Sequence, residues 1–137
     1  MSKTIKKDLM KTNVYDVKKT MVIVGTCLEY MQPKAYKELE SISNTIYDVC
    51  LEETHINMVI TKVIGMLSRT NIDTIIFATV DKSPHCIQMH YIESEIKKAM
   101  NLDKIKIIHY VAIDNKLIEI SKDTIKKSKT LSVLEQE

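Results

Sequence analysis

Glycine and proline are scarce in this chain, which has two of each among its 137 residues. Gly25 stands alone after the first apolar segment. Loops that cradle nucleotide phosphates need several closely spaced glycines, because their backbone N–H groups must approach the phosphate without intervening side chains. The composition therefore excludes a glycine-rich phosphate loop and predicts connections that are few and tight.

Long apolar runs and a strong charge of either sign are also missing. The longest uninterrupted apolar segments span only a few residues, as at positions 21–24 and 75–78, so no transmembrane segment is expected. The formal net charge is +2, with 28% of the residues charged. Because this charge creates no strong field, we expect neither a membrane nor a nucleic acid as a partner.

The three cysteines, Cys27, Cys50 and Cys86, are odd in number and widely spaced. No apolar run of the signal-peptide kind occurs near the start. A disulfide framework is therefore not expected, and a reducing cytoplasm is the predicted location. Cys50 is interpreted as a packing residue beside Ile46 and Val49.

The first 19 residues are basic. Six lysines face only two aspartates there: Lys3, Lys6, Lys7, Lys11, Lys18 and Lys19 against Asp8 and Asp16. The lysines come without arginine, which favours a solvated arm over a nucleic-acid tail. We interpret residues 1–19 as a basic arm or short helix, and residues 20–137 as a single α/β domain.

Segments rich in β-branched residues predict strands at positions 20–26, 73–80 and 104–113. The first two are continuously apolar, as expected of parallel strands that are covered on both faces. Residues 117–120 follow Asp114 and Asn115 and indicate a hairpin return. We therefore predict a three-layer α/β domain, with about three parallel strands, an antiparallel edge strand and helices on both faces.

Positions 33–71, between the first two strands, are predicted to hold two helices. Apolar residues at spacings of three and four mark the first, namely Ala35, Leu39, Ile42, Ile46 and Val49. A second such series follows, namely Ile56, Ile60, Val63, Ile64 and Leu67. Both series have the period of an amphipathic helix. A weaker helix is expected at 122–134.

The segment from Ala78 to His90 combines an apolar strand end with a thiol and two imidazoles. Ser83 is a favourable N-cap and Pro84 suits the first helical position, so a helix is expected to begin there. Cys86 then falls at the third helical position, beside the positive end of the helix dipole. This position favours the thiolate, the form of cysteine that attacks electrophiles and binds metals.

Two loops are expected to meet at one edge of the sheet, because the carboxyl ends of neighbouring parallel strands lie at the same edge. The first loop carries Gly25, Thr26 and Cys27, and the second carries Asp81, Ser83, His85 and Cys86. Open α/β sheets bind their ligands at this edge. We therefore predict a joint Cys/His site there.

Helical geometry predicts where the side chains after Ser83 point. At 100° per residue, His85 shares the stripe that faces the sheet with Met89, and His90 is rotated further outward. Cys86 and His90 are four residues apart and are expected to touch.

Ile87 and Tyr91 occupy the opposite side of the same helix, which would therefore be apolar on two faces. A partner helix or a second subunit is expected to cover the outer face. A homo-oligomer is predicted on this basis, with a dimer favoured.

Thiol chemistry on a small molecule, catalytic or redox, is the first of three functions that the sequence supports. Its predicted catalytic residues are Cys86, His85, His90 and Asp81. Its predicted ligand-binding residues are Gly25, Thr26 and Ser83. In this hypothesis Cys86 is the nucleophile, and a histidine is its base or stabilises the thiolate.

The second hypothesis is a zinc or iron site, because thiolates and imidazoles are ligands that these ions accept. Its predicted ligands are Cys27, His85, Cys86 and His90. The third is a non-catalytic oligomeric domain that holds a small anion at the helix end near Ser83, with His90 solvated. His109 is interpreted as a strand histidine near the surface of the sheet.

Overall fold

Strands β2 (Thr20–Gly25) and β4 (Thr74–Val80) form the centre of the sheet. The computed structural model describes residues 4–15, 19–128, 132 and 135 and, for residues 84–86, the backbone alone. The two strands run parallel, with Ile23 opposite Phe77. Residues 21–25 and 75–80 are all buried. The prediction of strands covered on both faces is therefore confirmed.

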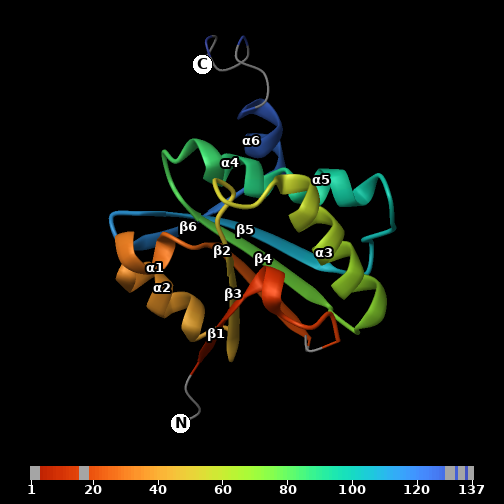
Figure 1. Ribbon diagram of the computed structural model, residues 1–137. Coiled ribbons are helices and arrows are strands. Elements are labelled where there is room, and N and C mark those ends of the chain that lie inside the picture. Colours follow the sequence, from red (N-terminus) through yellow and green to blue (C-terminus); the bar gives the residue numbers. More distant parts are fainter. Residues whose placement is uncertain (1–3, 16–18, 129–131, 133–134, 136–137) are drawn as a thin grey trace.

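Six strands form one sheet within the described residues, in the order β1-β3-β2-β4-β5-β6 (Figure 1). The outer strands are β1 (Ile5–Asp8), β3 (Thr45–Val49), β5 (Lys106–Ile113) and β6 (Lys116–Ile120). All neighbours pair in parallel except β5 and β6, which are antiparallel. The α/β class and the mainly parallel sheet are confirmed, but the sheet is wider than predicted.

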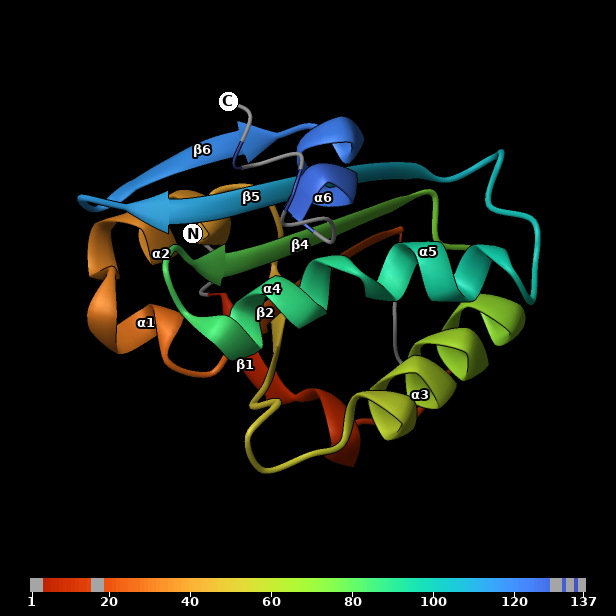
Figure 2. The ribbon, with the colours of Figure 1, turned by 90° about the horizontal axis from the view of Figure 1, so that it is seen from above.

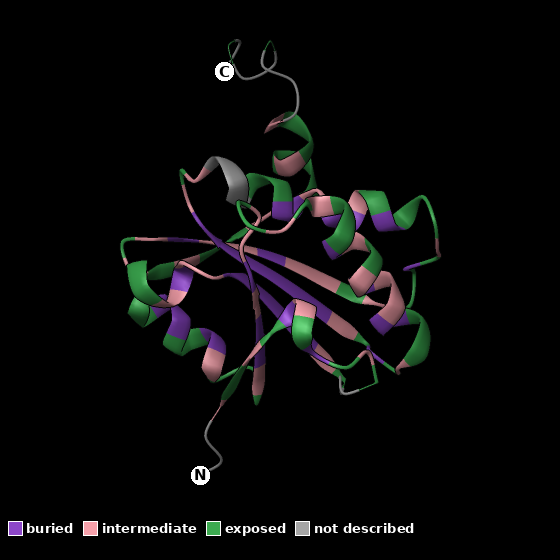
Figure 3. Cartoon of the chain, viewed as in Figure 1, coloured by how far each residue is buried: buried purple, intermediate pink, exposed green. Residues whose placement is uncertain are grey.

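Helices cover both faces of the sheet, which makes three layers (Figure 2). On one face lie α1 (Leu28–Met31) and α2 (Pro33–Glu40). On the other lie α3 (Ile56–Arg69), α4 (Pro84–His90) and α5 (Ile92–Lys97). Alternate strand residues enter two separate apolar clusters, with Ile23 and Phe77 in one and Val24 and Ala78 in the other. Figure 3 shows this burial concentrated in the central strands.

The predicted helix through Val49 is wrong in its second half. Helix α2 ends at Glu40, and the chain re-enters the sheet as β3. The spacing of Leu39, Ile42 and Ile46 fits a helical stripe, but Ile42 lies in the turn after the helix and is exposed. Residues 45–49 are largely β-branched or aromatic, and burial between β1 and β2 decides in favour of a strand. The second predicted helix is confirmed as α3.

The N-terminal segment differs from the predicted arm. Residues 5–8 form β1, which pairs with β3, and Leu9–Lys11 form a short 3-10 helix. Leu9 is fully buried in the cluster beneath α3. Three of the four residues of this edge strand are charged, namely Lys6, Lys7 and Asp8, so its sequence lacks the apolar character of the central strands. Charged residues are typical of protected sheet edges.

The predicted hairpin between β5 and β6 is confirmed. Asp114 and Asn115 have φ values of 52° and 60°, as a type I′ turn requires. The backbone N–H of Asn115 donates to Gln32 Oε1 at 2.6 Å. The hairpin is thereby joined to the start of α2.

The predicted helix after Ser83 is divided at Tyr91 into α4 and α5. Met89, Ile92 and Ile96 are buried as expected, whereas Ala99 is exposed. A last helix, α6 (Lys122–Ser128), lies on the same side, and the hydroxyl of Tyr91 is 3.0 Å from Ser128 Oγ. The rest of the predicted helix, beyond 128, falls mostly outside the described residues. Within the described part of the chain, no helix has the length and apolar character needed to cross a membrane.

The two-sided core makes a stability prediction. Ile23→Ala, at a side chain with 0% exposure, is expected to lower the free energy of unfolding by about 2–5 kcal/mol, because it removes apolar contacts and leaves a cavity. Ile118→Ala, at a side chain with 47% exposure on β6, should change it by less than about 0.5 kcal/mol. Urea unfolding of both variants measures the difference. Equal losses would contradict the assignment of β2 to the buried centre.

Candidate functional site

A cavity of about 260 Å³ lies at the carboxyl edge of strands β3, β2 and β4. After β2 the chain continues to β3 on one side of β2, whereas after β4, on the other side of β2, it continues to β5 in the opposite direction. The order of the strands therefore reverses between β2 and β4. Loops diverge at such a reversal and leave a crevice between them. We call this space the edge cavity.

The edge cavity brings together four of the residues predicted from the sequence: Gly25, Thr26, Cys27 and Ser83. Cys50 and Glu52, from the loop after β3, line it as well. Neither residue was predicted to belong to the site, because residues 45–49 were interpreted as a helix. Cys50 is half-buried at the cavity rather than a packing residue inside a helix.

The loop after β2 is fixed by two hydrogen bonds of Thr26. Its backbone N–H donates to the carbonyl of Val49 at 3.1 Å, and its hydroxyl donates to Asp48 Oδ2 at 2.9 Å. Cys27 immediately precedes α1, and its carbonyl accepts a hydrogen bond from the N–H of Met31 at 2.9 Å. The half-buried Cys27 thiol is thereby placed at the edge cavity on a short, bonded loop.

Asp81 lies on the other side of α4. Its backbone N–H donates to the carbonyl of Ala112 at 3.0 Å, and it lines a separate cavity together with Lys82 and Thr79. The expected convergence of Asp81 with Cys27 is therefore wrong. Lys82 has a φ of 71°, and this left-handed residue turns the chain between Asp81 and Ser83.

His85 and Cys86 lie in the first turn of α4, but their side chains fall outside the described part of the structure. Their predicted roles stay predictions. Their backbone follows Ser83 by two and three residues, and Ser83 lines the edge cavity.

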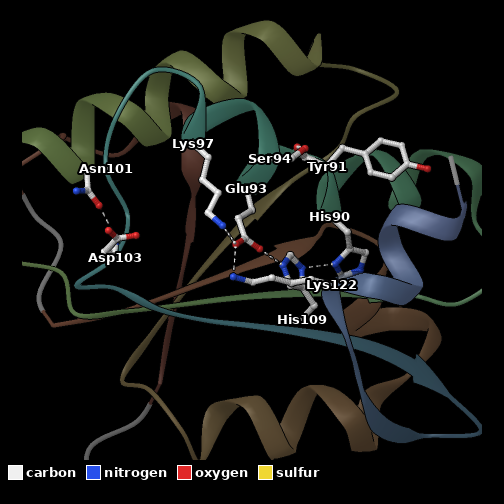
Figure 4. Close-up of polar contacts among 9 residues, drawn as sticks. All are labelled: His90, Tyr91, Glu93, Ser94, Lys97, Asn101, Asp103, His109 and Lys122. Carbon is white, nitrogen blue, oxygen red and sulfur yellow. Dashed lines mark hydrogen bonds and ion pairs between the residues drawn. The ribbon is translucent and has the colours of Figure 1, made fainter.

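His90 belongs to a buried chain of polar side chains that joins α4, α5 and β5 (Figure 4) and extends to Thr79 on β4. His90 Nε2 lies 2.8 Å from Thr79 Oγ1, and His90 Nδ1 lies 2.9 Å from His109 Nδ1. His109 Nε2 lies 2.7 Å from Glu93 Oε1. We call these four residues the buried relay. Only 4% of His90 and 2% of His109 is exposed.

The relay corrects three expectations. His90 points into the core rather than outward, because α4 and α5 bury two adjacent stripes instead of one. Both of its ring nitrogens are hydrogen-bonded, so neither is left to serve as the base for Cys86. His109 is buried and stacks on Phe77, with ring centroids 5.2 Å apart, rather than lying near the surface.

The carboxylate of Glu93 anchors the relay. Burial alone would raise its pKa, but the hydrogen bond from His109 and the ion pair with Lys122 outweigh that effect and lower the pKa to about 2. Lys122 Nζ lies 2.8 Å from Glu93 Oε2, and Lys97 Nζ lies 4.0 Å from the same oxygen. Glu93 is therefore ionised at neutral pH and holds α6 against α5.

The pKa of His90 is lowered to about 3, first because burial disfavours its charged form and second because His109 lies beside it. His90 is therefore neutral at neutral pH. A neutral imidazole has one donor and one acceptor nitrogen, so it can pass a proton between its two neighbours. The relay is chemically able to pass a proton to His109 when the hydroxyl of Thr79 gives its proton to His90 and takes up another from outside the relay.

Four functional candidates were not predicted from the sequence, namely Glu93, His109, Thr79 and Lys122. The alternation of side chains along β5 places His109 on the same face as Ile107 and Val111, so its burial could have been predicted from the sequence. The partner helices of that face could not be identified from the sequence.

The predicted metal ligands are not all brought together. Cys27 lines the edge cavity, whereas His90 is bonded within the relay on the far side of α4. Among the side chains that the structure describes, no group of three or more His, Cys, Asp or Glu residues is arranged to hold a metal ion. The contribution of His85 and Cys86 to such a site stays a prediction.

Comparison with known families finds a match to one family model, the Rossmann-like domain, over residues 17–137. No curated protein and no solved structure matches this chain. The matched range includes β2 to β6 and all the helices that surround the edge cavity and the relay.

The depressed pKa of His90 makes the fold sensitive to acid. Above about pH 6.5 His90 is neutral in both the folded and the unfolded chain; between about pH 6.5 and 3 only the unfolded chain binds the proton. We therefore expect the free energy of unfolding to decrease as the pH is lowered from about 6.5 to 3. Urea titrations at a series of pH values measure this change.

His90→Gln should be less stable at neutral pH and should lose much of that pH dependence. His55→Asn, at an exposed residue that caps α3, is the matched control and should keep it. A His90→Gln variant with an unchanged pH profile would show that the buried imidazole is not the group responsible.

Proposed function

The chain belongs to the Rossmann-like domain family, and we propose that it binds a small molecule in the edge cavity and acts on it through a cysteine thiol. The observation that carries the proposal is the lining of this cavity, where two thiols, Cys27 and Cys50, lie with the hydroxyl-bearing Ser83 at the edge of the sheet. Family membership supports the fold, and the reaction is argued from the residues alone.

The size and lining of the edge cavity favour a small ligand. Its volume of about 260 Å³ lies just below the usual range for ligand pockets. Met31, Val49, Leu51 and Met89 supply apolar walls. Polar groups from three different loops converge on the remaining surface, an arrangement that fixes the orientation of a bound molecule.

Cys86 is the proposed nucleophile, with Cys27 as the thiol that already lines the cavity. Cys86 lies three residues after Ser83, so its backbone belongs to the first turn of α4, next to the cavity. Addition of the thiolate to an unsaturated carbon, such as a carbonyl carbon, forms a C–S bond while the π electrons move to the oxygen. The thiol proton passes to a base, which can return it to that oxygen. Because His90 is engaged in the relay, Glu52 is the proposed acceptor, and its carboxylate lies at the cavity.

The setting that we propose is a reducing cytoplasm, in which these thiols stay unoxidised. We also propose a homodimer. Tyr30 and Met31 are 73% and 59% exposed on α1, and they offer an apolar surface that a second copy could cover. The outer face of α4, which was expected to pack against a partner helix or a second subunit, is partly covered by α6.

Alkylation by iodoacetamide tests the thiol proposal. In this reaction the sulfur displaces iodide from carbon and the thiol loses its proton, so the rate reports the thiolate and its accessibility. We expect Cys86 or Cys27 to react at least about tenfold faster in the folded protein than in the urea-unfolded chain, and Cys50 to react more slowly. Peptide mass spectrometry measures each rate.

A variant that fills the cavity provides the control. Ser83→Met should slow the fast reaction, because its side chain occupies the edge cavity, whereas Ser68→Met at the exposed end of α3 should not. If all three thiols react no faster in the folded protein than in the unfolded chain, the proposed thiol chemistry is wrong.

A further inference from the structure

Two adjoining cavities lie under α6, on the far side of α4 from the edge cavity. One has a volume of about 300 Å³, and its lining includes His90, Glu93, Lys97, Lys122, Ile125 and Lys126. The other has a volume of about 190 Å³, and its lining includes Thr79, Asp81, Lys82, Ile87, His90 and Ile125. His90 and Ile125 line both, so we treat them as one space, the α6 crevice.

The buried relay meets the α6 crevice at both ends. Thr79 and His90 line one part of it, and Glu93 lines the other. His109 connects the two ends from within the core, with 2% exposure. A proton that moves along the relay therefore changes what the crevice wall offers to a ligand.

The positions of the relay protons follow from the ionised carboxylate. Glu93 accepts, so His109 donates from Nε2. If His109 is neutral, its Nδ1 accepts from His90 Nδ1–H, and His90 Nε2 then accepts from the hydroxyl of Thr79. In this state the hydrogen of Thr79 is engaged, and the hydroxyl offers the crevice only lone pairs.

One added proton on His109 reverses the two other hydrogen bonds. His109 then donates from both nitrogens, His90 accepts at Nδ1, and His90 donates from Nε2 to the oxygen of Thr79. The hydrogen of Thr79 is released from His90 and is available to an acceptor in the crevice. An anion bound at Thr79 is thus favoured by the protonated relay.

The charge of the crevice also favours an anion. Four lysines line the two cavities, namely Lys82, Lys97, Lys122 and Lys126, against the two carboxylates Asp81 and Glu93. With neutral histidines the excess is two positive charges. Ile87, Ile120 and Ile125 supply apolar walls for the rest of a ligand.

We propose that the α6 crevice is a second binding site, for a small organic carboxylate with an apolar body, and that the relay takes up one proton when the carboxylate binds. The carboxylate accepts a hydrogen bond from Thr79, and the lysines supply the surrounding positive field. This site is separate from the edge cavity, and the two proposals stand or fail independently.

The direction of the pH dependence follows from the charge of the ligand. The groups that surround His109 in the relay are Glu93 and Lys97 on α5, Lys122 on α6, His90 on α4 and Phe77 on β4. A bound carboxylate adds negative charge and raises the proton affinity of the relay. By linkage, the ligand binds more tightly at low pH and loses affinity as the pH rises.

Titration calorimetry with butyrate tests the site, with butyramide as a neutral ligand of the same shape. At about pH 8 butyrate should bind with net uptake of close to one proton, seen from buffers of different ionisation enthalpy, and about tenfold more tightly at about pH 6. Butyramide should bind more weakly and without proton uptake. Failure of butyrate to bind, or equal binding of both ligands at each pH, overturns the proposal.

Two pairs of variants locate the site. Lys126→Gln, at the crevice, should weaken butyrate binding severalfold, while Lys34→Gln, exposed on α2 across the sheet, should not. Thr79→Val should weaken it about tenfold and abolish proton uptake, whereas Thr79→Ser keeps the hydroxyl and should retain both. Since Lys126 is not part of the core, its variant keeps the test decisive even if Thr79→Val does not fold. Unchanged binding in Lys126→Gln contradicts the proposed place of the site.

Discussion

The helical layer over β4 and β5 depends on the hydrogen bond between Glu93 and His109. A buried carboxylate is costly unless it is paired, and Glu93 obtains its partners from β5 and, through Lys122, from α6. This pairing fixes α5 against the sheet. The bond from His90 to Thr79 does the same for α4. Because α4 separates the edge cavity from the α6 crevice, the relay positions one wall of each.

Much of the fold could be predicted because the central strands are apolar on both faces. The continuous apolar runs at 20–25 and 74–80 are short and rich in β-branched residues, a pattern typical of buried parallel strands. The edge regions were harder. Residues 45–49 have apolar spacings that suit a helix equally well, and three of the four residues at 5–8 are charged. In both cases the neighbouring strand decides the structure, and a single sequence does not reveal that neighbour.

The candidate site could be predicted only where topology alone determines it. Gly25, Thr26, Cys27 and Ser83 meet because parallel strands end at one edge. His90 was predicted to point outward because the helical geometry was applied with one buried stripe of side chains. Polar partners on β4 and β5 form hydrogen bonds with His90, and these allow a second stripe to be buried. Glu93 was missed for the same reason. A buried carboxylate is recognisable only when the residue that satisfies it is known.

The central claim is that His90 and His109 form one hydrogen-bonded unit whose direction is set by Glu93. Long-range ¹H–¹⁵N NMR of the two imidazoles during a pH titration tests it most directly, because the ring nitrogen shifts report which nitrogen carries the proton. We predict that when the pair of rings takes up one proton, the proton of His90 moves from Nδ1 to Nε2 in the same step. If His90 keeps one tautomer while the pair takes up this proton, the two rings are not coupled and the relay is only a packing arrangement.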